Sequence, residues 1–141
     1  KFKNVKSIAL YYPMSYEPNV IPLINYCWTE DIQVILPVIS ENSMAWKQYL
    51  PNTLLLKSSL GFLEPSNTQD VPLSTLSAIV VPFLGLNSQG CRLGHGKGFY
   101  DRALQNYQGL TLGYGFDFQQ VEFEAEPWDI ALDDFLLISV E

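Results

Sequence analysis

The stretch Ala78-Ile79-Val80-Val81-Pro82 decides the fold class of this chain. Its consecutive apolar residues, closed by a proline, predict a strand that is buried on both faces of a sheet. A glycine-rich loop is expected next, at residues 85–98, and then a helix at about residues 98–107. A buried strand that leads through a loop into a helix indicates an α/β fold.

Other segments repeat this alternation of apolar strands and helices. We expect further strands at residues 7–12, 33–38, 110–114 and 135–140. Asn19 is expected to cap a helix at about residues 20–29, and Pro22 falls in its first turn, where the missing N–H does no harm. Residues 46–56 are ambiguous, and the prolines within residues 63–73 indicate a loop.

The sequence therefore predicts a single domain, residues 1–141, of the α/β class: a three-layer α/β/α arrangement with a mainly parallel sheet covered on both faces. Ligands of such sheets bind beyond the carboxyl ends of the strands. The glycine-rich loop that follows Val81 and the segment that follows Tyr12 are both expected at that edge.

Composition and charge argue against several classes of protein. Hydrophobic residues make up 48% of the chain and charged residues 16%, which is enough apolar material for a core. No apolar run approaches the roughly 20 residues that span a bilayer, and no signal-peptide pattern follows the basic start. The net charge is −7, and residues 117–141 hold eight carboxylates without Lys or Arg, so a nucleic-acid surface is disfavoured.

The two cysteines, Cys27 and Cys91, lie far apart and show no metal-ligand spacing, so a structural zinc site is not expected. A disulfide remains open, although two free thiols in a reducing cytosol are the simpler interpretation. We therefore expect a cytoplasmic protein that binds neither nucleic acid nor a membrane. The sequence leaves open whether it is a monomer or a weak homo-oligomer.

The segment Arg92-Leu93-Gly94-His95-Gly96-Lys97-Gly98-Phe99-Tyr100-Asp101-Arg102 carries the chemistry. Glycines alternate with other residues directly before the expected helix, so consecutive backbone N–H groups can point into one concavity. Arg92 and Lys97 add full positive charges, and together these groups predict an anion site. The glycine spacing is neither that of a Walker A loop nor that of a Rossmann fingerprint. A flexible surface loop is the alternative interpretation.

Residues 92–102 resemble the RLGxGxGYYD signature of the 5-formyltetrahydrofolate cyclo-ligase family. The flanking segments agree more weakly with the same family, at residues 63–65, 81–86, 112–114, 119–120, 128–129 and 132–133. The resemblance runs from about Ser7 to the end of the chain. It implies a three-layer α/β fold and an enzyme that uses ATP and Mg²⁺ in one-carbon folate metabolism.

The resemblance also implies one reaction. ATP phosphorylates the formyl oxygen of 5-formyltetrahydrofolate, N10 attacks the activated carbon, and phosphate leaves. The products are 5,10-methenyltetrahydrofolate, ADP and phosphate. The only partner that it implies is this small-molecule substrate.

Carried over residue by residue, the resemblance assigns the ATP phosphates to Arg92, Leu93, Gly94, His95, Gly96, Lys97, Gly98, Phe99 and Tyr100. Arg92 and Lys97 are the implied catalytic charges. The folate is assigned to Tyr12, Glu17, His95, Gly96, Lys97, Gly98 and Phe99, with Tyr12 and Glu17 at the pterin ring. Asp101 and Asp129 are the implied Mg²⁺ ligands.

Each assignment has a plainer alternative. Asp101 lies in the first turn of the expected helix, where carboxylates are common because of the helix dipole. Asp129 has many acidic neighbours and fits a solvated face, and Glu17, before Pro18, fits a turn. Glu64 is better explained by structure than by chemistry. Four aromatic residues are expected in the core or along a groove rather than in chemistry: Trp46, Phe62, Tyr107 and Tyr114.

The chain departs from the family at its start. Members usually carry a helical segment before the first strand, with Lys or Arg residues that reach ATP, and this chain begins almost at the strand. The departure is consistent with a truncated chain or with a degenerate homologue. A non-catalytic homologue that binds folate or nucleotide is therefore the second hypothesis. A small kinase or sugar-phosphate enzyme on the same sheet is the third, since one fold hosts many functions.

Overall fold

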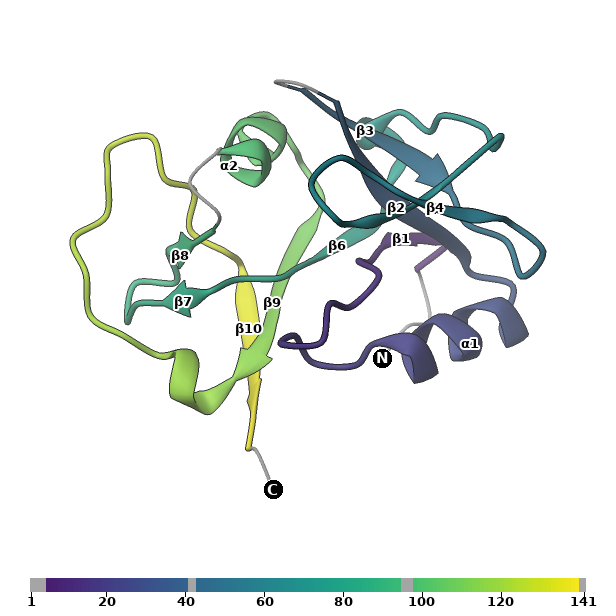
Figure 1. Ribbon diagram of the computed structural model, residues 1–141. Coiled ribbons are helices and arrows are strands. Elements are labelled where there is room, and N and C mark those ends of the chain that lie inside the picture. Colours follow the sequence, from purple (N-terminus) through teal and green to yellow (C-terminus); the bar gives the residue numbers. More distant parts are fainter. Residues whose placement is uncertain (1–4, 41–42, 95–97, 140–141) are drawn as a thin grey trace.

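A computed structural model describes residues 5–40, 43–94 and 98–139 of the chain. A six-stranded sheet crosses its centre in the order β10-β9-β6-β1-β2-β3 (Figure 1). All neighbouring strands pair in parallel except β2 and β3. The strands are β1 (Ser7–Ala9), β2 (Gln33–Ser40), β3 (Ser43–Gln48), β6 (Ala78–Val81), β9 (Leu110–Phe116) and β10 (Asp134–Ile138). The expectation of a mainly parallel sheet is confirmed.

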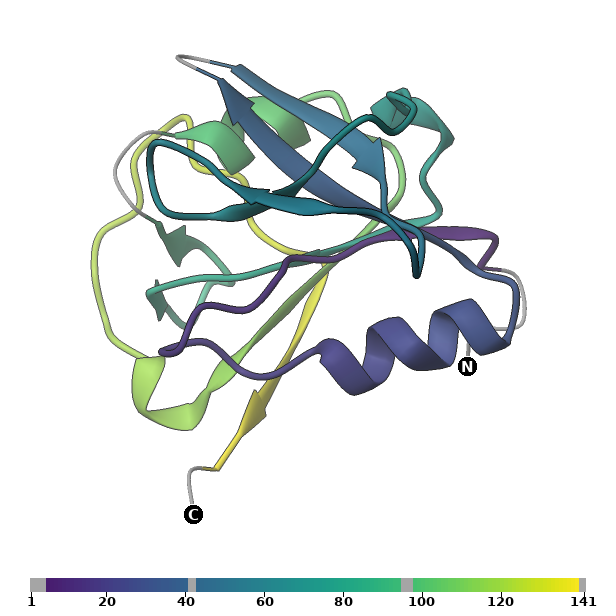
Figure 2. The same cartoon turned by 45° about the vertical axis from the view of Figure 1, so that its right-hand side comes forward.

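Alternate residues of the central strands face two separate apolar cores. One face carries Ile8, Val34 and Val80 and packs against helix α1 (Ile21–Thr29). The opposite face carries Ile35 and Ile79 and packs against helix α2 (Phe99–Leu104). Figure 2 shows the two helices on opposite sides of the sheet. Because successive side chains of a strand point to opposite faces, strands that are apolar at every position need cover on both sides. The three-layer prediction is thus confirmed.

The helix boundaries differ slightly from those expected. The N-cap of α1 is Val20 rather than Asn19, although Asn19 Oδ1 still accepts the Ile21 N–H at 3.0 Å. The prediction of Asn19 as the N-cap residue was therefore wrong by one residue. Helix α2 ends at Leu104, earlier than the expected residue 107. Gly98 begins it in a left-handed conformation (φ +69°), which glycine adopts at no steric cost.

Two segments that were expected to be irregular contain short hairpins. β4 (Leu55–Lys57) pairs antiparallel with β5 (Leu63–Pro65), so the prediction of a loop at residues 63–73 was wrong at its start. β7 (Gly85–Leu86) pairs with β8 (Arg92–Leu93) inside the glycine-rich segment. Two short 3₁₀ helices, η1 (Leu73–Thr75) and η2 (Asp117–Gln119), complete the described elements. No helix of the described ranges has the length and apolar content that crossing a bilayer requires.

Candidate active site

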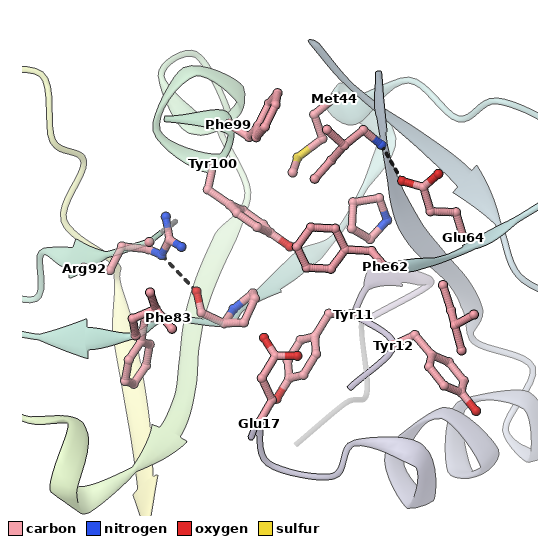
Figure 3. A pocket seen from close by; sticks show the side chains of 16 residues that line it. Tyr11, Tyr12, Glu17, Met44, Phe62, Glu64, Phe83, Arg92, Phe99 and Tyr100 are labelled. Carbon is pink, nitrogen blue, oxygen red and sulfur yellow. Dashed lines mark hydrogen bonds between the residues drawn. The ribbon is translucent and has the colours of Figure 1, made fainter. Parts of the chain in front are cut away.

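An aromatic pocket opens at the carboxyl ends of β1, β2 and β6, where the chain order predicts ligand binding. The space that it encloses totals about 840 Å³, a figure that includes open solvent. Six aromatic side chains line it: Tyr11, Tyr12, Phe62, Phe83, Phe99 and Tyr100 (Figure 3). Polar groups are few, and Arg92, Glu17 and Glu64 are the charged residues among the lining. The pocket is thus an apolar slot with sparse polar anchors.

Arg92 is a charged residue that is nevertheless buried, and its side chain is held in one position. The side chain is 8% exposed, its Nε donates to the Pro82 carbonyl at 2.9 Å, and its guanidinium lies 5.0 Å from the centroid of the Tyr100 ring. Burial lowers the pKa of Arg92, while Tyr100 and the carboxylates of Asp101, Asp129 and Glu17 oppose that shift. A hydrogen bond, an aromatic face and nearby acids together keep a buried guanidinium charged and fixed in place.

Gly94 is required by the position of Arg92. A Cβ at Gly94 would come within 2.5 Å of Arg92 Nη2 and 3.1 Å of its Cζ. Gly94 was predicted for a turn that presents backbone N–H groups. The structure adds a second reason for glycine there, which is that only a residue without a side chain lets the guanidinium lie against the backbone.

The loop between β1 and α1 brings Glu17 into the pocket. Glu17 Oε1 accepts the Met14 N–H at 2.8 Å, and the Tyr11 hydroxyl donates to the Pro18 carbonyl at 3.0 Å. Burial raises the pKa of Glu17, and the Met14 N–H and the Arg92 charge act in the opposite direction. Glu17 therefore forms the turn that the plainer alternative foresaw and lines the pocket as well. Tyr12 lies edge-on to Tyr49, with ring centroids 6.4 Å apart.

Asp101 and Asp129 come from distant segments and interact. Burial raises the pKa of Asp101, and the Asp129 charge raises it further against the opposing effects of the Ile130 N–H and Arg92. Asp101 Oδ1 lies 3.5 Å from the Ile130 nitrogen, and Asp129 Oδ2 accepts the Glu126 N–H at 2.9 Å. Two carboxylates suit Mg²⁺, which takes its remaining ligands from phosphates and water. Groups of three or more acidic, His or Cys residues that could hold a metal ion do not occur in the described part of the chain.

The structure brings together most of the described residues that sequence assigned to the site. Six of them line the pocket: Tyr12, Glu17, Arg92, Gly94, Phe99 and Tyr100. Leu93 is 43% exposed and lies outside the lining, and Gly98 begins α2. His95, Gly96 and Lys97 lie outside the described residues.

Other lining residues lie outside the signature motif of residues 92–102. Tyr11 precedes an assigned residue, and Phe83 lies in the flank that resembles the family, so both had a weak signal. Met44 and Ile39 reach the pocket only because β2 and β3 fold back together. Phe62 lines the pocket and Trp46 lies in the core, which agrees with the expectation of groove or core for these aromatic residues.

Comparisons with known proteins agree with one family. The model of the 5-formyltetrahydrofolate cyclo-ligase family matches residues 1–137. The 5-formyltetrahydrofolate cyclo-ligase of Haemophilus influenzae is 36% identical over 144 residues, covering 96% of this chain and 77% of the relative. That of Escherichia coli K12 is 36% identical over 135 residues, covering 89% and 74%.

Two solved structures have a similar fold. The 5,10-methenyltetrahydrofolate synthetase of Mycoplasma pneumoniae superimposes with a TM-score of 0.76 at 28% identity, covering 94% of this chain and 73% of its own. The synthetase of the same name from Aquifex aeolicus gives a TM-score of 0.80 at 31% identity, covering 98% and 70%.

Proposed function

This chain belongs to the 5-formyltetrahydrofolate cyclo-ligase family, and from that premise we propose which of its residues carry the family's reaction. Its function is the ATP-dependent conversion of 5-formyltetrahydrofolate to 5,10-methenyltetrahydrofolate. The match of the family model over residues 1–137 carries this conclusion, and the shared fold supports it. The roles of single residues are our proposal.

We place the folate in the aromatic pocket, with Glu17 against the pterin ring. A pterin presents adjacent N–H donors, and one carboxylate accepts two of them. Glu17 supports this role because its carboxylate lines the pocket and the Met14 N–H holds it in place. Tyr12 and Phe99 add aromatic surface for a flat ring. In the same proposal His95, Gly96, Lys97 and Gly98 border the folate.

The ATP phosphates belong, in this proposal, to residues 92–100, with Lys97 as a point charge. Phosphoryl transfer needs positioned groups and neutralised charge rather than covalent help from the protein. Arg92 supports this role because its guanidinium lines the pocket and is fixed by Pro82 and Tyr100. Its electrostatic partners include Glu17, which is proposed to bind the pterin, and Asp101 and Asp129, which are proposed to bind Mg²⁺. Arg92 therefore lies where the folate and phosphate subsites meet.

The residues then have separate tasks in the reaction. The formyl oxygen takes the γ-phosphoryl group of ATP and ADP leaves. N10 attacks the activated carbon and loses its proton, and cleavage of the carbon–oxygen bond releases phosphate. Arg92 and Lys97 neutralise the charge on the transferring group, while Glu17 keeps the pterin oriented so that the formyl oxygen faces them.

Mg²⁺ is the metal that the acid pair fits. Asp101 and Asp129 would hold it, and a bound Mg²⁺ neutralises phosphate charge. We also propose that the enzyme is cytoplasmic and acts on this small molecule without a nucleic-acid or membrane partner. The free, buried thiols of Cys27 and Cys91 support that location.

The test is direct turnover. Purified protein, ATP, Mg²⁺ and 5-formyltetrahydrofolate are mixed, and the absorbance of 5,10-methenyltetrahydrofolate is followed. We expect product formation that requires ATP. Calorimetric binding of folate or ATP without turnover would instead identify a non-catalytic homologue, and absence of both would remove the assignment of this pocket.

A further inference from the structure

One wall of the pocket is a β-hairpin that lies outside the main sheet. Strands β4 and β5 pair only with each other, and the turn between them carries Phe62. Phe62, Leu63 and Glu64 all line the pocket, and Phe62 reaches toward Tyr100 in Figure 3. An isolated two-stranded hairpin is marginally stable in water. The position of this wall therefore depends on how the hairpin is attached to the rest of the domain.

The end of β2 offers an unusual attachment point. Strand β1 is short, and its register with β2 ends at Ala9 and Ile35. Beyond that point β2 continues to Ser40, and Pro37 has no N–H to donate. The next residue of β2 whose N–H points toward the β1 side is Ile39, and this N–H donates to Glu64 Oε2 at 2.8 Å. A side-chain carboxylate on the hairpin thus takes the place of a missing strand neighbour.

We propose that Glu64 is a positioning residue of the pocket, whose carboxylate fixes the β4–β5 hairpin to the end of β2 so that Phe62 and Leu63 form the folate-facing wall. The inference rests on the proposed placement of the folate. Glu64 was expected from sequence to be structural, and the hydrogen bond to Ile39 defines what that structure does. Glu64 acts as a hydrogen-bond acceptor, and its charge has no part in the chemistry.

Two substitutions separate the acceptor from the charge. Glu64→Gln keeps a side-chain oxygen that accepts the Ile39 N–H and removes the charge. Glu64→Ala removes the acceptor altogether. Ser66→Ala is the matched control, because Ser66 Oγ donates to the Leu54 carbonyl at 2.9 Å within the base of the same hairpin and leaves the bond to β2 intact.

Steady-state kinetics give the first readout. In Glu64→Ala we expect the KM for 5-formyltetrahydrofolate to rise about tenfold, with kcat and the KM for ATP within about twofold, because a displaced wall weakens folate binding uniformly. Glu64→Gln and Ser66→Ala should stay within about twofold of the unsubstituted enzyme. If the folate KM rises as much in Glu64→Gln as in Glu64→Ala, the proposal is overturned. An unchanged folate KM in Glu64→Ala would overturn it as well. If Glu64→Ala does not fold, Glu64→Gln alone decides: a folate KM within about twofold supports the acceptor role, and a rise of about tenfold overturns it.

Amide hydrogen exchange gives a readout that does not depend on activity. The Ile39 amide should exchange faster in Glu64→Ala and at the original rate in Glu64→Gln. Equal exchange in all variants would contradict the attachment. If the unsubstituted chain binds and turns over no folate while the exchange pattern holds, the proposed function has failed and the attachment of the hairpin has not.

Discussion

Gly94→Ala tests whether the position of Arg92 determines activity. The Cβ of alanine would come within 2.5 Å of Arg92 Nη2, whereas ordinary contacts begin at 3.4 Å, so the guanidinium must move by about 1 Å. Misplacing a catalytic group by about 1 Å costs on the order of a hundredfold in rate. We therefore expect kcat/KM to fall about a hundredfold, which corresponds to about 2.7 kcal/mol of transition-state stabilisation.

A double-mutant cycle with Arg92→Lys identifies the cause of that loss. Lysine keeps the charge but has no Nη2 to collide with the new methyl group. If the collision explains the effect, adding Gly94→Ala to Arg92→Lys should lower kcat/KM by less than about threefold, so the two substitutions are strongly non-additive. Additive losses, with a raised KM for ATP and an unchanged kcat, would refute this reasoning. They would show instead that Gly94 serves the phosphates through its backbone.

Three further predictions concern the other anchors of the site. Tyr11→Phe removes the hydrogen bond to Pro18 that restrains the Glu17 loop, so the folate KM should rise about fivefold. Tyr107→Phe is the control: it loses a 2.8 Å hydrogen bond to the Leu76 carbonyl, away from the pocket, and should alter stability alone. Equal folate KM values in the two variants would contradict a positioning role for Tyr11. Because burial raises the pKa of Glu17, its carboxylate takes up a proton at a pH above the usual carboxylate pKa of about 4.3. We therefore expect kcat/KM to fall as the pH decreases through that higher range. If the pH profile of kcat/KM is unchanged in Glu17→Gln, Glu17 is not the titrating group. Asp101→Asn should shift the Mg²⁺ titration of activity to higher concentration by at least about tenfold, and an unaltered titration would remove Asp101 as a ligand.

The parts of the fold that sequence predicted are those in which local pattern and burial agree. Residues 78–81 are apolar at every position because both faces of β6 are covered, and this is visible in the sequence alone. The hairpins were missed because strands of two or three residues are too short to show periodicity. They exist because tertiary contacts hold them, as the bond between Glu64 and Ile39 illustrates.

The same division applies to the site. Residues 92–100 lie together in the chain, so sequence reasoning could assign them to one site. Phe62 and Met44, in contrast, reach the pocket through strand pairing that no local pattern encodes. The close approach of Arg92 to Gly94 was equally hidden. A glycine in a turn predicts backbone freedom, and only the folded structure shows that a side chain occupies the space that a Cβ would fill.

The charges around Arg92 explain why a divalent cation and ATP should bind together. The electrostatic partners of Arg92 include three carboxylates, Glu17, Asp101 and Asp129. A polyphosphate tail that approached alone would meet these negative charges in a partly buried site, where screening is weak. A divalent cation held by Asp101 and Asp129, as proposed, would offset those charges and leave Arg92 to act on the transferring group. Net acidity of the whole protein is therefore compatible with an anionic nucleotide, because the local charge of the cleft decides binding.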